Sequence, residues 1–256
     1  MSAPDDSVKG EAARHIRGFT RDDVPALEQI ADGIHIGAAL AAGYGRISAG
    51  FTRMDAGARA PLAAPYEEVW VLTAGAMRID SADGVVSARP GDLVHLRPAS
   101  RGELEVTDDL DMLALAFPPL WEVELEAWEL AREQSVAGPF ARVLSRDRKA
   151  YPQPAADRWL FTTADAGRHF EMGFGRAGTD GAEDEFTVAG DRVMVATTGR
   201  FRIHTDGAAG PHVRVITVEQ GGFAYLPAGT SGTLSAEPGS EIAWAHLSRS
   251  PRRRPT

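Results

Sequence analysis

The clearest indication of the fold is the sequence "APYEEVWVLTAGAMRI", residues Ala64–Ile79. Apolar and β-branched residues fill its middle, which favours a strand, and Gly75 stands where a tight turn would follow. The stretch has a second copy, because "VWVLTAGAMRI" (Val69–Ile79) aligns with "VMVATTGRFRI" (Val193–Ile203) and Gly75 falls on Gly199. The sequence therefore predicts one strand-and-turn unit that occurs twice.

Two further blocks repeat in the same order. "GDLVHLRPASRGEL" (Gly91–Leu104) aligns with "GGFAYLPAGTSGTL" (Gly221–Leu234), and "FTRMDAG", which ends at Gly57, aligns loosely with "MGFGRAG". Three matched blocks indicate a duplication. Short β-type runs separated by Gly, Pro and Asp fill most of the chain, which is typical of a sandwich or barrel. We expect an all-β protein made of two similar barrels with a few peripheral helices.

The chain also suggests where its parts begin and end. Residues 22–32 and 119–136 have apolar spacing typical of helices, and the polar, Pro-rich segment 145–157 is the best domain boundary. The predicted parts are an N-terminal extension with a short helix (1–43), a first barrel (44–121), a helix and linker (122–157), a second barrel (158–248) and a disordered basic tail (249–256).

Composition excludes several classes of function. The chain has no cysteine, which excludes disulfides, zinc–thiolate sites and cysteine nucleophiles. Its net charge of −9 argues against nucleic acid as a partner. We find no secretory signal and no apolar run long enough to span a membrane, so we expect a cytoplasmic protein without a membrane partner. Walker, dinucleotide-binding and Gly-x-Ser-x-Gly motifs are absent as well.

The repeated blocks resemble the two short motifs of the cupin superfamily. Gly57, Glu68 and Gly75 have the spacing of the first motif, and Pro90-Gly91-Asp92 matches the turn of the second. As a whole the chain resembles a bicupin, which implies two stacked jelly-roll barrels, each with a pocket at its mouth, and a homodimer. "PYEEVWVLTAGAMRI", "ARPGDLVHLRP" and "ALAFPPLW" also resemble the ethanolamine-utilisation cupin proteins, over most of residues 44–121.

The chain departs from the family at the positions that hold its metal. The two motif-one histidines fall near Ala63 and Pro65, and the later histidine falls on Gly102. In the second half, Arg192 stands where the family has Glu, and Gly232 replaces the histidine. A divalent site needs three or four converging ligands, so we expect neither a cupin-type metal nor another cofactor. A metal site with unconventional ligands stays an alternative.

Glu68 is the first candidate catalytic residue. The resemblance implies that Glu68 points into the first barrel, and because residues two apart on a strand face the same side, Trp70 is then expected to point there as well. A carboxyl beside an aromatic wall gains a raised pKa and can serve as a general acid or base. The alternative is that Glu68 pairs with Arg53, itself a candidate substrate-binding residue, or with Arg78. Glu67 alternates with Glu68 and is expected to face solvent.

Two more residues complete the candidate site in the first barrel. His95 on the motif-two strand is expected near Glu68, where the two would form a proton-transfer pair. The alternative is that His95 is a satisfied structural histidine in the core. Tyr66 is expected at the mouth, where its hydroxyl would donate a hydrogen bond to a substrate oxygen.

The second barrel offers a candidate binding pocket. An arginine in the glutamate position would bind a carboxylate or another oxyanion through its planar fork. The candidate substrate-binding residues there are Arg192, Met194, Tyr225, Trp244 and His246. The alternative is a filled core in which Arg192 bridges to Asp184 or Glu185.

Three functions follow from these residues. The first is a metal-independent bicupin enzyme that acts on a small organic molecule by acid–base chemistry, with Glu68 and His95 as acid and base. Isomerisation, cyclisation, dehydration and lyase action all suit such a pair, as would a place in bacterial specialised or sugar-acid metabolism. The second is a non-catalytic protein that binds a small molecule. The third is a cupin with an unconventional metal site.

Overall fold

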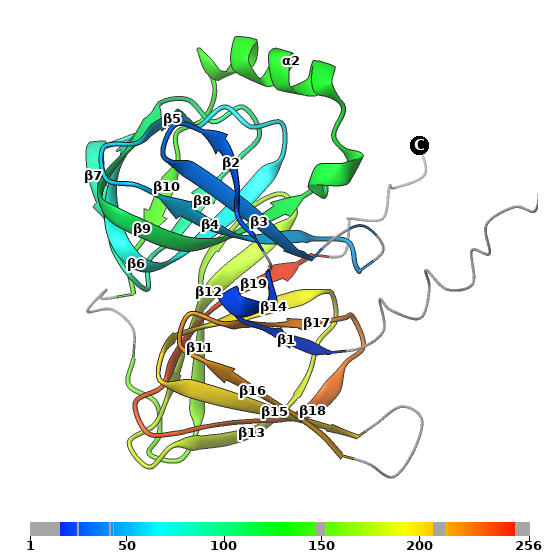
Figure 1. The fold of residues 1–256 in the computed structure, drawn as a ribbon. Coiled ribbons are helices and arrows are strands. Elements are labelled where there is room, and N and C mark those ends of the chain that lie inside the picture. Colours follow the sequence, from blue (N-terminus) through cyan, green and yellow to red (C-terminus); the bar gives the residue numbers. More distant parts are fainter. Residues whose placement is uncertain are drawn as a thin grey trace, which may run out of the picture.

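The computed structural model describes residues 16–24, 26–40, 42, 44–146, 152–206 and 213–248. Antiparallel strands make up most of these residues, and two β-barrels lie one above the other (Figure 1). The all-β prediction is confirmed. The predicted basic tail and residues 147–151 of the predicted linker lie outside the described residues.

The first barrel is built on one nine-stranded sheet. Its order is β10-β8-β6-β9-β4-β3-β2, with β7 beside β6 and β5 beside β9. The strands are β2 (Glu28–Ala31), β3 (Ile34–Leu40), β4 (Ser48–Met54), β5 (Arg59–Pro61), β6 (Glu67–Ser81), β7 (Gly84–Ala88), β8 (Leu93–Leu96), β9 (Glu103–Phe117) and β10 (Arg142–Leu144).

The second barrel consists of a six-stranded sheet, β1-β17-β14-β19-β12-β11, and a four-stranded sheet, β13-β18-β15-β16. The first strand in the described part of the chain, β1 (Arg17–Phe19), pairs with β17 and so belongs to this barrel. The other strands are β11 (Trp159–Ala166), β12 (Phe170–Ala177), β13 (Ala182–Thr187), β14 (Arg192–Thr198), β15 (Arg200–Asp206), β16 (Val213–Glu219), β17 (Phe223–Leu226), β18 (Ser231–Ala236) and β19 (Glu241–Leu247).

The prediction of a helix over residues 22–32 is wrong. The chain forms only the short 3-10 helix η1 (Arg21–Asp23) there and then the hairpin β2–β3, whose two-residue turn is Asp32-Gly33. Gly33 has a φ of +66°, which suits Asp-Gly at a hairpin turn and overrides the weak helical spacing. Since β2 and β3 lie in the first barrel's sheet, that sheet begins before residue 44.

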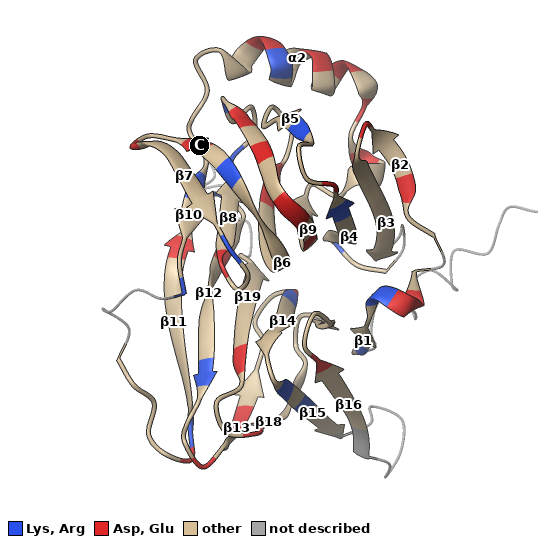
Figure 2. Cartoon of the chain, turned by 60° about the vertical axis from the view of Figure 1, so that its left-hand side comes forward, with Lys and Arg blue, Asp and Glu red and all other residues tan. Residues whose placement is uncertain are grey.

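The helical segment expected over residues 119–136 is present as two pieces. The 3-10 helix η2 (Leu120–Glu122) leads into α2 (Leu125–Ser135). Helix α2 lies outside the first barrel, at its upper end in Figure 1, and only Ala131 of its residues is buried. Acidic residues are prominent on α2 and on β9, which agrees with the negative net charge (Figure 2).

The apolar core has three main parts, one inside each barrel and one between the barrels. Strand β6 contributes to two of them, because Trp70 and Leu72 point into the first barrel while Val69 and Val71 point toward the second. Val69 and Val71 lie in one cluster with Phe170 of β12. Both faces of β6 are therefore buried at this point, which explains its nearly continuous apolar sequence.

Gly75 reverses which residues of β6 face the inside of the barrel. Before it, the even-numbered Trp70 and Leu72 point inward, and after it the odd-numbered Met77 and Ile79 do so. The pairing of β6 with β9 shifts register around Gly75, as expected for a β-bulge. Gly75 therefore lies at a bulge inside a long strand and not in a tight turn.

The second copy of the motif behaves in the same way. Met194 and Ala196 point into the second barrel before Gly199, and Phe201 and Ile203 point inward after it. Gly75 and Gly199 have φ values of +73° and +66°, and the next matched pair, Gly91 and Gly221, also has positive φ values of +88° and +82°. The repeat read from the sequence therefore corresponds to a repeat in backbone conformation.

We predict that Gly75→Ala destabilises the protein more than Gly57→Ala. Both glycines have positive φ, which costs an alanine about 1 kcal/mol or more. A Cβ at Gly75 would overlap the backbone oxygen of Asp109, whereas a Cβ at Gly57 meets nothing within 4 Å. Urea unfolding should show an extra loss of at least about 2 kcal/mol for Gly75→Ala. Equal losses in the two variants would contradict the role given to this close approach.

Candidate functional site

The first barrel contains an apolar cavity of about 540 Å³. Side chains of β3, β4, β6 and β9 form its wall, and Leu120, Trp121 and Trp128 of the η2–α2 segment cover one end. Its volume is in the range that holds a small organic ligand. Polar side chains are few among the described lining residues: Ser48, Thr52, Tyr66 and Glu68, besides the indole N–H groups.

Glu68 is the one carboxylate among the described residues that line this cavity. It points inward, as the resemblance implies, on the same face of β6 as Trp70, and no arginine of the described lining residues accompanies it. Glu68 keeps some exposure to the cavity, yet burial among apolar groups raises the pKa of its carboxyl to about 7. The indole N–H of Trp70 opposes this rise, although it makes no hydrogen bond of normal geometry. The alternative pairing with Arg53 or Arg78 is therefore wrong.

Tyr66 also lines the cavity and contacts its cover. The ring of Tyr66 packs edge-on against Trp128 of α2, with the ring centroids 5.4 Å apart. Burial, and secondarily the charge of Glu68, raises the pKa of the Tyr66 phenol. The hydroxyl therefore stays protonated and can donate a hydrogen bond to a molecule in the cavity.

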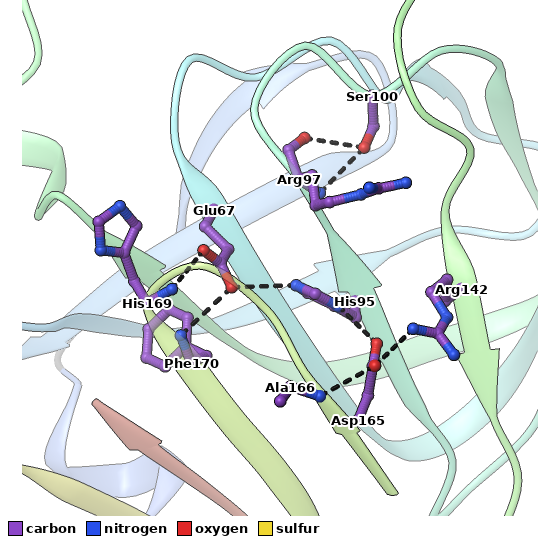
Figure 3. A network of polar contacts seen from close by, with 9 residues as sticks. All are labelled: Glu67, His95, Arg97, Ser100, Arg142, Asp165, Ala166, His169 and Phe170. Atoms are coloured by element: carbon purple, nitrogen blue, oxygen red, sulfur yellow. Dashed lines mark hydrogen bonds and ion pairs between the residues drawn. The ribbon is translucent and has the colours of Figure 1, made fainter. Parts of the chain in front are cut away.

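The predicted pair of Glu68 and His95 is wrong. On β8 the alternation turns Val94 and Leu96 into the first barrel, so His95 points the other way, toward the second barrel. Nε2 of His95 donates to Oε1 of Glu67 at 3.0 Å, and Nδ1 donates to Oδ2 of Asp165 at 2.8 Å (Figure 3). The alternative, a satisfied structural histidine, fits this arrangement.

Glu67 does not face solvent as expected but is fully buried between the barrels. It accepts hydrogen bonds from the backbone N–H groups of His169 (2.9 Å) and Phe170 (3.2 Å) as well as from His95 (Figure 3). Burial alone would raise the pKa of Glu67, but the hydrogen bonds from His95 and from the two backbone groups outweigh it and lower the pKa.

The polar network between the barrels is balanced in charge. Because carboxylate oxygens only accept hydrogen bonds, both ring nitrogens of His95 must carry a proton for both bonds to form. Arg142 pairs with the other oxygen of Asp165, so two cations compensate two carboxylates. Gly167 is required beside them, since a Cβ there would overlap Oε1 of Glu67. The network joins the β11–β12 hairpin to the first barrel.

Two candidate binding residues lie elsewhere than expected. Arg53 is exposed on the outer side of β4 and borders a surface cleft between the barrels, not the cavity. Tyr225 points away from the second barrel's interior because β17 turns Ala224 inward instead. Its hydroxyl donates to Asp191 at 2.9 Å in the layer between the barrels. Neither residue therefore lies in the barrel interior where it was predicted.

The other four residues predicted for the second barrel do lie together. Arg192 pairs in register with His246, and Met194 pairs with Trp244, so all four face the same side of adjacent strands. Met194 and Trp244 belong to the core inside the second barrel. The alternative bridge from Arg192 to Asp184 or Glu185 is not found among the described residues, where Asp184 pairs with Arg158 instead.

The donor groups of the described residues do not fit a divalent metal. No group of three or more His, Asp or Glu side chains in those residues converges in a way that could hold one. In the first barrel Glu68 lacks a second carboxylate or imidazole among the described lining residues.

Within the described parts of the chain, none of the helices has the length and apolar character needed to cross a bilayer.

Comparisons with known proteins agree on the fold. No protein-family model matches the chain, and no curated protein matches it either. Three similar solved structures are AerE from Microcystis aeruginosa (9% identity over 88% of this chain and 98% of that one, TM-score 0.60), a mutant of Bacillus subtilis oxalate decarboxylase (11%, 93% and 78%, 0.62) and a cupin 2 conserved barrel domain protein from Leptotrichia buccalis (13%, 91% and 96%, 0.55). Together they show a cupin-type fold.

We predict that His95→Ala strongly destabilises the protein. Removing the cation leaves Glu67 and Asp165 buried without it, and breaking a buried ion pair in this way costs about 3–5 kcal/mol. Urea unfolding at neutral pH would measure the loss. The control is His35→Ala, since His35 is partly exposed and 3.9 Å from Asp55, and it should change stability by no more than about 0.5 kcal/mol. A loss below about 1 kcal/mol in His95→Ala would refute the network's structural role.

We predict that Glu68 makes the free energy of unfolding depend on pH. Its pKa is about 7 in the folded chain and near the ordinary value of 4.5 in the unfolded chain. The unfolded state ionises first, so the contribution of Glu68 to stability is present below about pH 4.5 and is lost as the pH rises to about 7. Subtracting the unfolding free energies of Glu68→Gln from those of the wild type should isolate this decline. A flat difference between pH 4.5 and 7 would contradict the raised pKa.

Proposed function

We propose that the protein binds a small, mostly apolar organic molecule inside the first barrel and that Glu68 moves a proton to or from it. The observation that carries this proposal is a carboxyl with a pKa of about 7 in an otherwise apolar cavity of about 540 Å³. At neutral pH such a group is present in both protonation states, which is the condition for efficient general acid–base catalysis.

The chemistry that suits one such carboxyl is a proton shift within a single molecule. Glu68 would take a proton as carboxylate and return it, as carboxylic acid, to another atom of the same molecule. Isomerisation, cyclisation, dehydration and elimination can all proceed in this way. Tyr66 would donate a hydrogen bond to a carbonyl or hydroxyl oxygen and so orient the molecule. His95 takes no part, since both its ring nitrogens are bound to carboxylates between the barrels.

The comparisons support small-molecule chemistry in a barrel of this kind. A neighbouring structure is an oxalate decarboxylase, so a similar fold supports an enzyme. The substrate of this chain must differ in character, because its cavity wall is apolar and offers no cation to a dianion among the described lining residues. The likeness of the first half to the ethanolamine-utilisation cupins stays a prediction.

A second candidate is a non-catalytic binding protein. It is favoured by the scarcity of catalytic groups, since Glu68 is accompanied in the cavity only by Tyr66, Ser48 and Thr52 as polar side chains among the described lining residues. A pocket for an apolar ligand needs only a few polar groups to orient what it binds. In that case Glu68 would recognise a donor on the ligand and would transfer no proton.

The uncharged fluorescent probe N-phenyl-1-naphthylamine tests occupancy of the cavity. We expect the wild type to bind it, with an affinity that falls at least about threefold as the pH rises past 7, because an ionised Glu68 makes the cavity less favourable for an apolar molecule. Glu68→Gln should bind the probe with no such pH dependence. Glu28→Gln, which alters an exposed carboxylate on β2, should behave as the wild type. Absence of probe binding would overturn the proposal.

Molecules that displace the probe can then be tested for conversion. Incubation in D₂O followed by mass spectrometry would detect deuterium incorporation or a rearranged product. We expect wild-type turnover with an inflection near pH 7 and a loss of at least about 100-fold in Glu68→Gln, with the probe still bound. Binding without conversion of any displacing molecule would favour the non-catalytic candidate. Full turnover by Glu68→Gln would remove Glu68 from the chemistry.

A further inference from the structure

Three polar residues form a row on the inner face of the second barrel. Glu171 of β12 pairs in register with His246 of β19, which in turn pairs with Arg192 of β14. Residues in register on neighbouring antiparallel strands face the same side, so the three side chains lie next to one another. Each is partly exposed and stands near an end of its strand, which leaves the row open to solvent.

Three nitrogen atoms, two in this row and one in the neighbouring Trp244, have no hydrogen-bond partner among the described residues. They are Nε of Arg192, Nδ1 of His246 and Nε1 of Trp244. A buried donor or acceptor without a partner costs about 1–3 kcal/mol. Three such atoms on adjacent side chains are uncommon in a folded protein and indicate that something outside the chain completes the site.

The arginine is held in place by packing and not by an acidic partner. Its guanidinium lies over the ring of Trp244, 5.2 Å from the ring centroid. Gly173, in register with Trp244, makes room for the indole, since a Cβ there would lie 3.0 Å from it. Glu171 is the nearest carboxylate in the row, but His246 lies between it and Arg192, and Glu171 accepts a hydrogen bond from Thr163 at 2.9 Å. The fork of Arg192 is thus oriented but not neutralised.

We propose that the second barrel binds the carboxylate group of a small organic acid at Arg192, with His246 and Trp244 as further hydrogen-bond donors. The planar guanidinium offers paired N–H groups with the geometry of a carboxylate. One arginine matches one negative charge, whereas a phosphate dianion would be under-compensated with Glu171 in the same row. Burial, followed by the charge of Arg192, lowers the pKa of His246, so its ring is neutral at pH 7 and one nitrogen donates.

This site is independent of the first barrel. Its residues come from β14 and β19, whereas the residues that line the apolar cavity come from residues 30–128. A carboxylate site in one barrel and an apolar cavity in the other would let the chain bind two different molecules. A negative result for one site therefore leaves the proposal for the other site unchanged.

The indole N–H resonance of Trp244 provides a direct readout by NMR. It is assigned by its absence in Trp244→Phe, and sodium benzoate is titrated at constant ionic strength with sodium phosphate in a parallel series. We expect benzoate to shift the resonance saturably with a Kd in the millimolar range or below. Arg192→Met should weaken binding at least about tenfold. Arg202→Met, which removes an exposed arginine from β15, should bind as the wild type.

Arg192→Lys keeps the charge but lacks the planar fork, so it should bind benzoate several-fold more weakly than the wild type. This variant decides the matter if Arg192→Met does not fold. The proposal is overturned if benzoate produces no saturable shift, if both Arg192 variants bind benzoate as the wild type does, or if phosphate binds more tightly than benzoate.

Discussion

The alternation of side chains along the first part of β6, from Glu67 to Leu72, determines both the packing between the barrels and the lining of the cavity. This strand has protein on both of its faces, with the interior of one barrel on one side and the other barrel on the opposite side. From Glu67 to Leu72 each residue must therefore suit one of two environments, and neighbours in the sequence alternate between them until the bulge at Gly75. The packing between barrels and the shape of the cavity are both set by the same few residues.

The consequence is clearest in the adjacent glutamates. Glu67 faces the second barrel, where a cation and two backbone N–H groups lower its pKa, and Glu68 faces an apolar cavity, where burial raises its pKa. One residue type thus takes opposite roles a single position apart, because the environment decides which protonation state is favoured. The paired carboxylate of Glu67 stabilises the contact between the barrels, whereas the carboxyl of Glu68 faces the apolar cavity.

Much of the fold could be predicted from the sequence, because local signals agree with it. The repeat and the all-β character follow from period-two patterns and from matched glycines, and the inward direction of Glu68 is implied by the resemblance to the cupins. The role of His95 could not be predicted in the same way, since both faces of β8 are apolar and its partner Asp165 is 70 positions away in the chain. The continuous apolar run in β6 does carry one usable signal. It indicates a strand that is buried on both faces, and on such a strand Glu67 cannot reach solvent. The Asp32-Gly33 turn is a local signal that outweighs helical spacing.

The pairing of β1 with β17 has a consequence for synthesis. Phe19 lies opposite Phe223, so roughly 200 residues must be made before this strand can find its place. On a ribosome the hairpin β2–β3 can join the first barrel while β1, only a few residues upstream, still waits for the end of the second. Strand β1 is thus among the last of the described strands to find its partner. When β1 pairs with β17, the segment that precedes the first barrel becomes part of the second barrel.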